Sequence, residues 1–156
     1  MFSATRRTNA FSLIELVIVV VIIGIIAAIA IPRMSRGATG ANDNALVGNL
    51  AVLRKAIDLY QAEHGGSYPT VADFEKAMTL YSNEAGDDFN ATKDATHVFG
   101  PYMRAVPPLT VGAKKGSNGV AAVDGAGVGW IYDANAGTIK SNTTEKDATG
   151  RLYNTY

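Results

Sequence analysis

The chain has 156 residues, which leaves room for one modest domain beyond the apolar segment near its start. It carries 14 basic and 14 acidic side chains, and this balance excludes a basic face large enough to make nucleic acid the primary partner. It contains no cysteine, which excludes disulfides and thiolate zinc sites.

Residues 1–10 form a short basic leader whose only charges are Arg6 and Arg7. Positive charge before an apolar segment holds that end of the chain in the cytoplasm. An ordinary secretory signal has its small-residue cleavage site after the apolar core, whereas here the small residue Ala10 comes before it. A cut after Ala10 would leave the apolar segment on the mature chain and create a new amine at Phe11.

Residues 11–31 are an apolar run with one charge, Glu15. As a helix this run would be about 31 Å long, which matches the roughly 30 Å hydrocarbon core of a bilayer. The run therefore predicts a transmembrane helix. A carboxylate inside that core costs on the order of 2.5–3.5 kcal/mol, so we expect Glu15 to have a specific partner.

The basic leader, the small residue at its end, the sequence Phe-Ser-Leu-Ile-Glu and the apolar run resemble the class III signal of type IV pilins and type II secretion pseudopilins. The resemblance implies that a prepilin peptidase cuts between Ala10 and Phe11 and methylates the new amine of Phe11. It also implies that Glu15 is needed for filament assembly. The family usually has Gly before the cut, so Ala10 is expected to be a less efficient substrate.

An amine at Phe11 and the Glu15 carboxylate can neutralise each other within one subunit or between neighbouring subunits. Pairing between neighbours would set the axial register of a helical assembly. We therefore expect the Phe11 amine to be the partner of Glu15.

Gly24 and Pro32 interrupt the apolar run, at a cost of roughly 1 and 3 kcal/mol inside a helix. The resemblance implies that they bound a stretch that unwinds or packs closely when subunits form filaments. The alternative is that they have no special role, because membrane helices tolerate both residues.

Residues 32–64 are predicted to continue the same helix with an amphipathic pattern. Apolar residues recur at spacings of three and four, which places them on one helical stripe. They are Leu46, Leu50, Leu53, Ile57 and Tyr60. Gly65 and Gly66 provide the stop signal.

Residues 65–156 are predicted to form the globular part. A short second helix is expected around Phe74 and Met78, followed by an irregular polar surface loop at residues 82–96. Three strands with hairpin connections are expected to form an antiparallel meander across the long helix. They are Val120–Val123, Val128–Tyr132 and Thr138–Ser141. The last fourteen residues are polar, which predicts a loosely ordered tail. The fold class is α+β and pilin-like.

The segment from Gly100 to Asn142 is similar to the C-terminal half of major pseudopilins of the G type, and that similarity implies a Ca²⁺ site in a C-terminal loop. The candidate ligands are Glu145 and Asp147, with Asp124 or Asp133 near them. Their spacing is not that of a dedicated calcium loop, so we expect no cofactor and interpret these residues as exposed acids.

No pattern of residues predicts an enzyme. His64 ends a predicted helix and His97 opens an apolar element, and neither has a partner at catalytic spacing. The glycines of residues 125–129 lead into a strand instead of a helix, which does not fit a dinucleotide-binding turn.

The sequence therefore predicts a structural subunit of a type II secretion pseudopilus, held in the inner membrane with its N-terminus cytoplasmic and its C-terminal domain periplasmic. Its expected partners are other copies of itself, related minor pilins or pseudopilins, an inner-membrane assembly platform, the prepilin peptidase and membrane lipid. The first alternative is a type IV pilin of a surface pilus. The second is a signal-anchored periplasmic domain with a binding or enzymatic role. Many type IV pilins close a loop with a disulfide, which a chain without cysteine cannot do.

Overall fold

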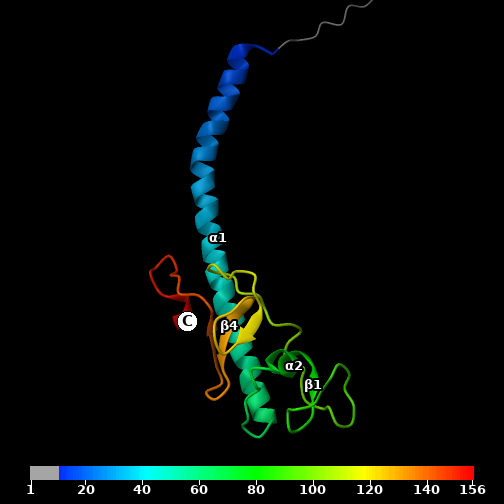
Figure 1. Ribbon diagram of the computed structural model, residues 1–156. Helices are drawn as coiled ribbons and strands as arrows, with labels where there is room; N and C mark the ends of the chain where they lie inside the picture. Colours follow the sequence, from blue (N-terminus) through cyan, green and yellow to red (C-terminus); the bar gives the residue numbers. More distant parts are fainter. Residues whose placement is uncertain (1–10) are drawn as a thin grey trace, which may run out of the picture. The chain divides into compact units, whose positions relative to one another are not determined.

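The computed structural model describes residues 11–156, and the side chains of all of these except residues 31–38. It contains two α-helices, five strands and a short 3₁₀ helix: α1 Leu13–Glu63, α2 Phe74–Thr79, β1 Tyr81–Ser82, β2 Phe89–Asn90, β3 Gly119–Ala121, β4 Val128–Asp133, β5 Thr138–Ser141 and η1 Tyr153–Thr155 (Figure 1). The chain divides into two compact units between Thr39 and Gly40. The predicted α+β fold class, with a long apolar helix and small sheets, is confirmed.

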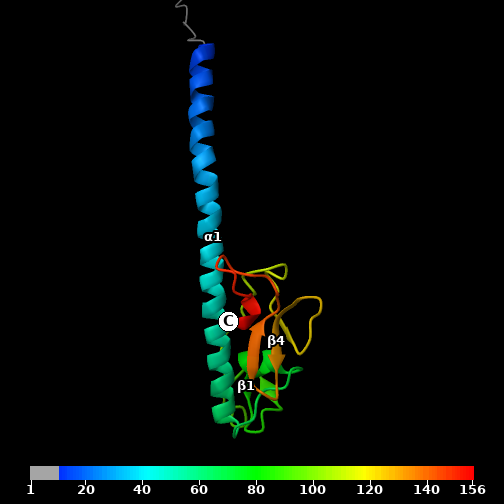
Figure 2. The same ribbon diagram turned by 90° about the vertical axis from the view of Figure 1, so that its left-hand side faces the viewer.

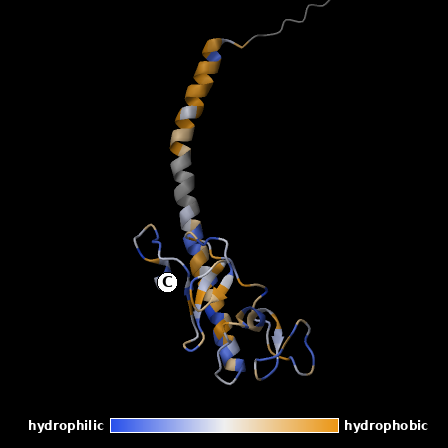
Figure 3. Cartoon of the chain, in the orientation of Figure 1, coloured by the Kyte–Doolittle hydropathy of each residue, from blue (hydrophilic) through white to orange (hydrophobic). Residues whose placement is uncertain are grey.

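The first unit contains the apolar part of α1. Leu13–Ala30 has a mean hydropathy of 3.2, is long and apolar enough to cross a membrane, and has none of its residues buried. Figure 3 shows this part of α1 as an almost continuous hydrophobic ribbon. Because so much apolar surface is unfavourable in water, the segment requires lipid or other protein around it.

The second unit has one hydrophobic core, built on the predicted stripe of α1. Each of the five stripe residues is at most 3 % exposed, as predicted from their spacing. They pack with the large rings of β4 and α2, namely Trp130, Tyr132 and Phe74. Figures 1 and 2 show the strands beside the second part of α1. Burying each large apolar side chain contributes about 1.5–3 kcal/mol relative to exposing it, so this stripe fixes the sheet to the helix.

The three-stranded sheet has the order β3-β4-β5 and is mixed. The β4–β5 hairpin is antiparallel as predicted, but β3 runs parallel to β4, so the hairpin predicted at residues 124–127 is wrong. The connection folds back along β3: the Gly119 N–H donates to the Gly127 carbonyl at 3.0 Å, and a Cβ on Gly119 would lie 2.6 Å from that oxygen. Gly119 permits this close approach of the Gly127 carbonyl because it has no Cβ. A hairpin would not require such an approach.

The polar segment 82–96 is more ordered than the predicted irregular loop. It contains β2, which pairs antiparallel with β1. Ser82 also forms a bridge with Phe99, in which each residue's N–H donates to the other's carbonyl. Asn83 stabilises the turn, because its Oδ1 accepts the N–H groups of Gly86 and Asp87 at 2.9 and 3.1 Å. Side chains that accept backbone N–H groups stabilise turns in this way.

The C-terminal fourteen residues are not the loosely ordered tail that their composition predicts. Tyr153 is 5 % exposed, and its hydroxyl donates to Asp43 Oδ1 on α1 at 2.7 Å. Arg54 of α1 donates to the Tyr156 carbonyl at 2.5 Å. Burial raises the pKa of Tyr153 to about 12, with a further contribution from the hydrogen bond to Asp43. One buried ring and two polar contacts with α1 therefore hold this segment in place.

His97 lies between two carboxylates in the connection that follows β2. Its Nδ1 is 2.9 Å from Asp94 Oδ2, and its Nε2 is 3.2 Å from Asp88 Oδ2. The hydrogen bond with Asp94 raises the pKa of His97, and the backbone N–H of His97 is the main cause of a lowered pKa for Asp94. Each shift favours the charged form, so the pair stabilises the folded connection.

We predict that His97 titrates above 6.5, the ordinary imidazole value, in the folded protein. Because the folded pKa is raised, the contribution of His97 to stability is complete below about pH 6.5 and is lost as pH rises through the folded pKa. NMR titration of the imidazole resonances measures the midpoint. Asp94→Asn should lower it, whereas Glu84→Gln, an exposed acid in the same segment, should not. Equal midpoints in the native protein and Asp94→Asn would contradict this assignment.

Candidate processing and assembly site

Ser12 caps the N-terminus of α1. Its Oγ accepts the Ile14 N–H at 3.3 Å, and its carbonyl accepts the Leu16 N–H at 3.2 Å. In return, the Ser12 N–H donates to Glu15 Oε2 at 2.9 Å. The bond from the Ser12 N–H to the acid three residues later is that of a capping box, although the Ser12 hydroxyl here accepts the Ile14 N–H in place of the Glu15 N–H. Both bonds help to start the helix, because they satisfy N–H groups that have no partner within it.

The capping box gives Glu15 a hydrogen-bond partner within its own helix. The carboxylate lies in the first turn, where the positive end of the helix dipole stabilises negative charge. Its second oxygen, Oε1, makes no hydrogen bond with the residues that the structure describes. Pairing with the Phe11 amine, expected from the sequence, stays a prediction.

Phe11 comes directly before the cap and is 84 % exposed, whereas Ala10 lies outside the described residues. Consecutive Cα atoms are about 3.8 Å apart, so an amine created at Phe11 would lie one residue from the N–H that holds Glu15. The predicted cut would thus place a cation beside the capped carboxylate.

Ser12 is the site residue that the sequence reasoning missed. The signal for it was present, because Ser-x-x-Glu before an apolar run is the sequence signature of a capping box.

Gly24 and Pro32, the two residues predicted to permit melting or packing, both lie within α1. A Cβ at Gly24 would meet no atom within 4 Å among the residues that the structure describes, so no close contact there requires a glycine. The side chain of Pro32 lies outside the described ones, and the role of both residues stays a prediction.

The structure does not bring Glu145 and Asp147 together as a metal site. Glu145 Oε1 accepts the Ala113 N–H at 2.6 Å. Asp147 Oδ1 accepts the Thr149 and Arg151 N–H groups at 2.7 and 2.9 Å. Among the residues that the structure describes, no three acidic, histidine or cysteine side chains are grouped as a metal site would require.

The two histidines have structural partners. His64 is 5 % exposed, with Nδ1 2.9 Å from the Tyr60 carbonyl and Nε2 3.0 Å from Ser82 Oγ. Its ring stacks on Tyr60 with a centroid distance of 3.9 Å. Ser82 is fully buried, so this pair is closed to a substrate. His97 is held by Asp94 and Asp88 as described above.

Comparison with known proteins adds one finding. Residues 5–31 match the family model described as the prokaryotic N-terminal methylation motif. The chain carries this motif. The match includes Ala10, Phe11 and Glu15, and the motif marks precursors of the type IV pilin and pseudopilin type, which a prepilin peptidase processes. No curated protein and no solved structure matches the chain.

We predict that Ser12→Ala destabilises the first turn of α1, because the Ile14 N–H loses its acceptor. Losing an N-cap side chain costs about 1 kcal/mol, which corresponds to roughly fivefold faster exchange of that amide. Hydrogen exchange followed by NMR on the uncleaved chain in detergent micelles measures this rate. Ser12→Thr keeps the acceptor and serves as the control. Equal protection of Ile14 in all three proteins would refute the capping role.

Proposed function

We propose that this chain is a structural subunit of a type II secretion pseudopilus, cut before Phe11 and polymerised through its N-terminal helix. The observation that carries the proposal is the methylation motif at residues 5–31, which coincides with an apolar helix that buries none of its own residues. Among the residues that the structure describes, none of this unit packs over the helix, so lipid surrounds it in the monomer and helices of other copies surround it in the filament.

Glu15 links processing to assembly in this proposal. Before cleavage its carboxylate is held by the Ser12 N–H, and the nitrogen of Phe11 is an uncharged amide. Cleavage converts that nitrogen into an amine that is protonated at neutral pH. The free oxygen of Glu15 then accepts a charge-assisted hydrogen bond, first from the amine of its own chain and then from that of a neighbour.

The proposed partners follow from this role. They are other copies of the chain, related minor subunits, the prepilin peptidase, an inner-membrane assembly platform and lipid. The apolar helix anchors the precursor in the inner membrane, and Arg6 and Arg7 keep its start in the cytoplasm while residues beyond the membrane enter the periplasm.

A type IV pilin of a surface pilus is the second candidate, because the methylation motif marks both kinds of precursor. The absence of cysteine and the similarity of residues 100–142 to G-type pseudopilins favour the pseudopilus. Deletion of the gene distinguishes the two: loss of protein secretion supports a pseudopilus, whereas loss of surface fibres with normal secretion supports a pilus.

We predict that the mature protein begins at N-methylated Phe11. Intact mass spectrometry of the protein from its own membranes measures both the cut and the methyl group. Cells without prepilin peptidase should retain residues 1–10, and Ala10→Gly should be processed at least as fast as the native chain. A mature protein that retains Met1, or one cut after Ile31, would exclude this processing and favour a signal-anchored periplasmic domain.

We predict that Glu15→Ala leaves membrane insertion intact but abolishes filaments. Removing the carboxylate makes insertion easier by on the order of 2.5–3.5 kcal/mol, while the neighbour's amine loses its acceptor. Membrane fractionation and electron microscopy of sheared filaments measure the two effects separately. Glu75→Gln, an exposed acid on α2, is the control and should assemble normally. Normal filaments from Glu15→Ala would refute the assembly role.

A further inference from the structure

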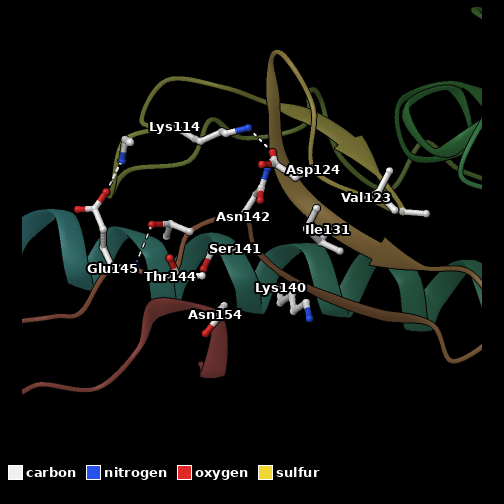
Figure 4. Close-up of a pocket in the computed structure, with 13 residues that line it drawn as sticks. Lys114, Val123, Asp124, Ile131, Lys140, Ser141, Asn142, Thr144, Glu145 and Asn154 are labelled. Atoms are coloured by element: carbon white, nitrogen blue, oxygen red, sulfur yellow. Dashed lines mark hydrogen bonds and ion pairs between the residues drawn. The ribbon is translucent and has the colours of Figure 1, made fainter.

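A polar cluster joins three segments at one end of the β3-β4-β5 sheet; we call Lys114, Asp124, Gly125 and Asn142 the Lys114 cluster. The Lys114 ammonium pairs with Asp124 Oδ1 and donates to the Gly125 carbonyl at 2.8 Å. Figure 4 shows the lysine extended toward Asp124, with Asn142 beside the same carboxylate. Lys114 comes from the loop before β3, and Asp124 from the connection between β3 and β4.

Asn142 adds the third segment, because it directly follows β5. Its Nδ2 donates to Asp124 Oδ1 and to the Val128 carbonyl, both at 2.7 Å. Its backbone N–H donates to the Gly129 carbonyl at 2.9 Å. Hydrogen bonds from Lys114 first, and then from Asn142, lower the pKa of Asp124, so the carboxylate stays ionised in this cluster.

The cluster uses the kind of oxygen atoms that a calcium ion takes. Calcium requires six to eight oxygen ligands from carboxylates, carbonyls and water. Here a carboxylate oxygen and a carbonyl oxygen converge on the Lys114 ammonium instead. Asn142 presents its NH₂ group to Asp124, and that group cannot ligate a cation.

The other acidic candidates do not complete a calcium site. Glu145 is bonded to the Ala113 N–H, and Asp147 is bonded to Thr149, Arg151 and the Tyr156 hydroxyl. Asp133 ends β4, whereas Asp124 precedes its start. Five steps along a strand separate Val128 from Asp133 by about 17 Å. The described residues therefore do not fit the calcium site that the similarity to G-type pseudopilins implied.

We propose that Lys114 is a built-in cation that replaces a divalent metal at this end of the sheet, so that the fold needs no calcium. The ammonium neutralises Asp124 and connects the loop before β3 to the β3–β4 connection. A divalent ion at Asp124 would have to displace this ammonium against charge repulsion. The inference does not depend on which kind of filament the chain forms.

The experiment compares thermal unfolding of the full chain in detergent with added Ca²⁺ and with a chelator. Trp130 is the only tryptophan of the chain and is fully buried, so its fluorescence reports unfolding of the second unit. We expect the same midpoint under both conditions. A midpoint that Ca²⁺ raises in the native protein overturns the proposal.

Lysine variants provide an independent measurement. Lys114→Gln removes the cation and should lower the midpoint by about 2–4 °C, a modest shift because the Asp124 side chain is 65 % exposed. Lys115→Gln is the matched control, since Lys115 is exposed and forms no ion pair among the residues that the structure describes. Lys114→Arg keeps the charge and should retain most of the stability. Equal midpoints for Lys114→Gln and Lys115→Gln overturn the proposal.

Discussion

Burial of one stripe of side chains along the second part of α1 is the interaction on which the globular unit depends. An isolated two-stranded hairpin such as β4–β5 is at best marginally stable in water, and the buried side chains of this hairpin belong to the core that the stripe forms. The first part of the same helix buries none of its residues. The second part of α1 thus forms the core of its unit, whereas the first part needs lipid or other protein around it. Folding depends on the second part, and the first part remains available for assembly.

The sequence predicted the features that local patterns control. The helical spacing from Leu46 to Tyr60 identified the buried stripe, and β5 has the predicted bounds. It did not predict the direction of β3, because that depends on a glycine that lets the connection approach closely. Nor did it predict the order of the last residues, because Tyr153 and Asp43 are 110 positions apart and neither side chain identifies its partner locally.

In the candidate site and in the Lys114 cluster, too, the sequence predicts local features but not contacts between distant segments. The processing motif could be predicted because its leader, small residue, acid and apolar run lie within one continuous segment. The family match at residues 5–31 lies within that segment. The capping role of Ser12 is equally local, because Ser12 and Glu15 are only three positions apart. The Lys114 cluster joins three segments, so no spacing in the sequence indicates it. Charge alone could not show which of two adjacent lysines would pair with Asp124.

The contact between Tyr153 and Asp43 has a consequence for the order of folding. The core of the second unit is complete only after Tyr153 has been synthesised, because this ring belongs to the core and lies 110 positions after its hydrogen-bond partner Asp43. The entropic cost of closing so long a loop grows only with the logarithm of its length. The late contact therefore affects the rate of folding more than the stability of the folded unit. Until then the Leu46–Tyr60 stripe is only partly covered, and incomplete chains expose it to chaperones and proteases.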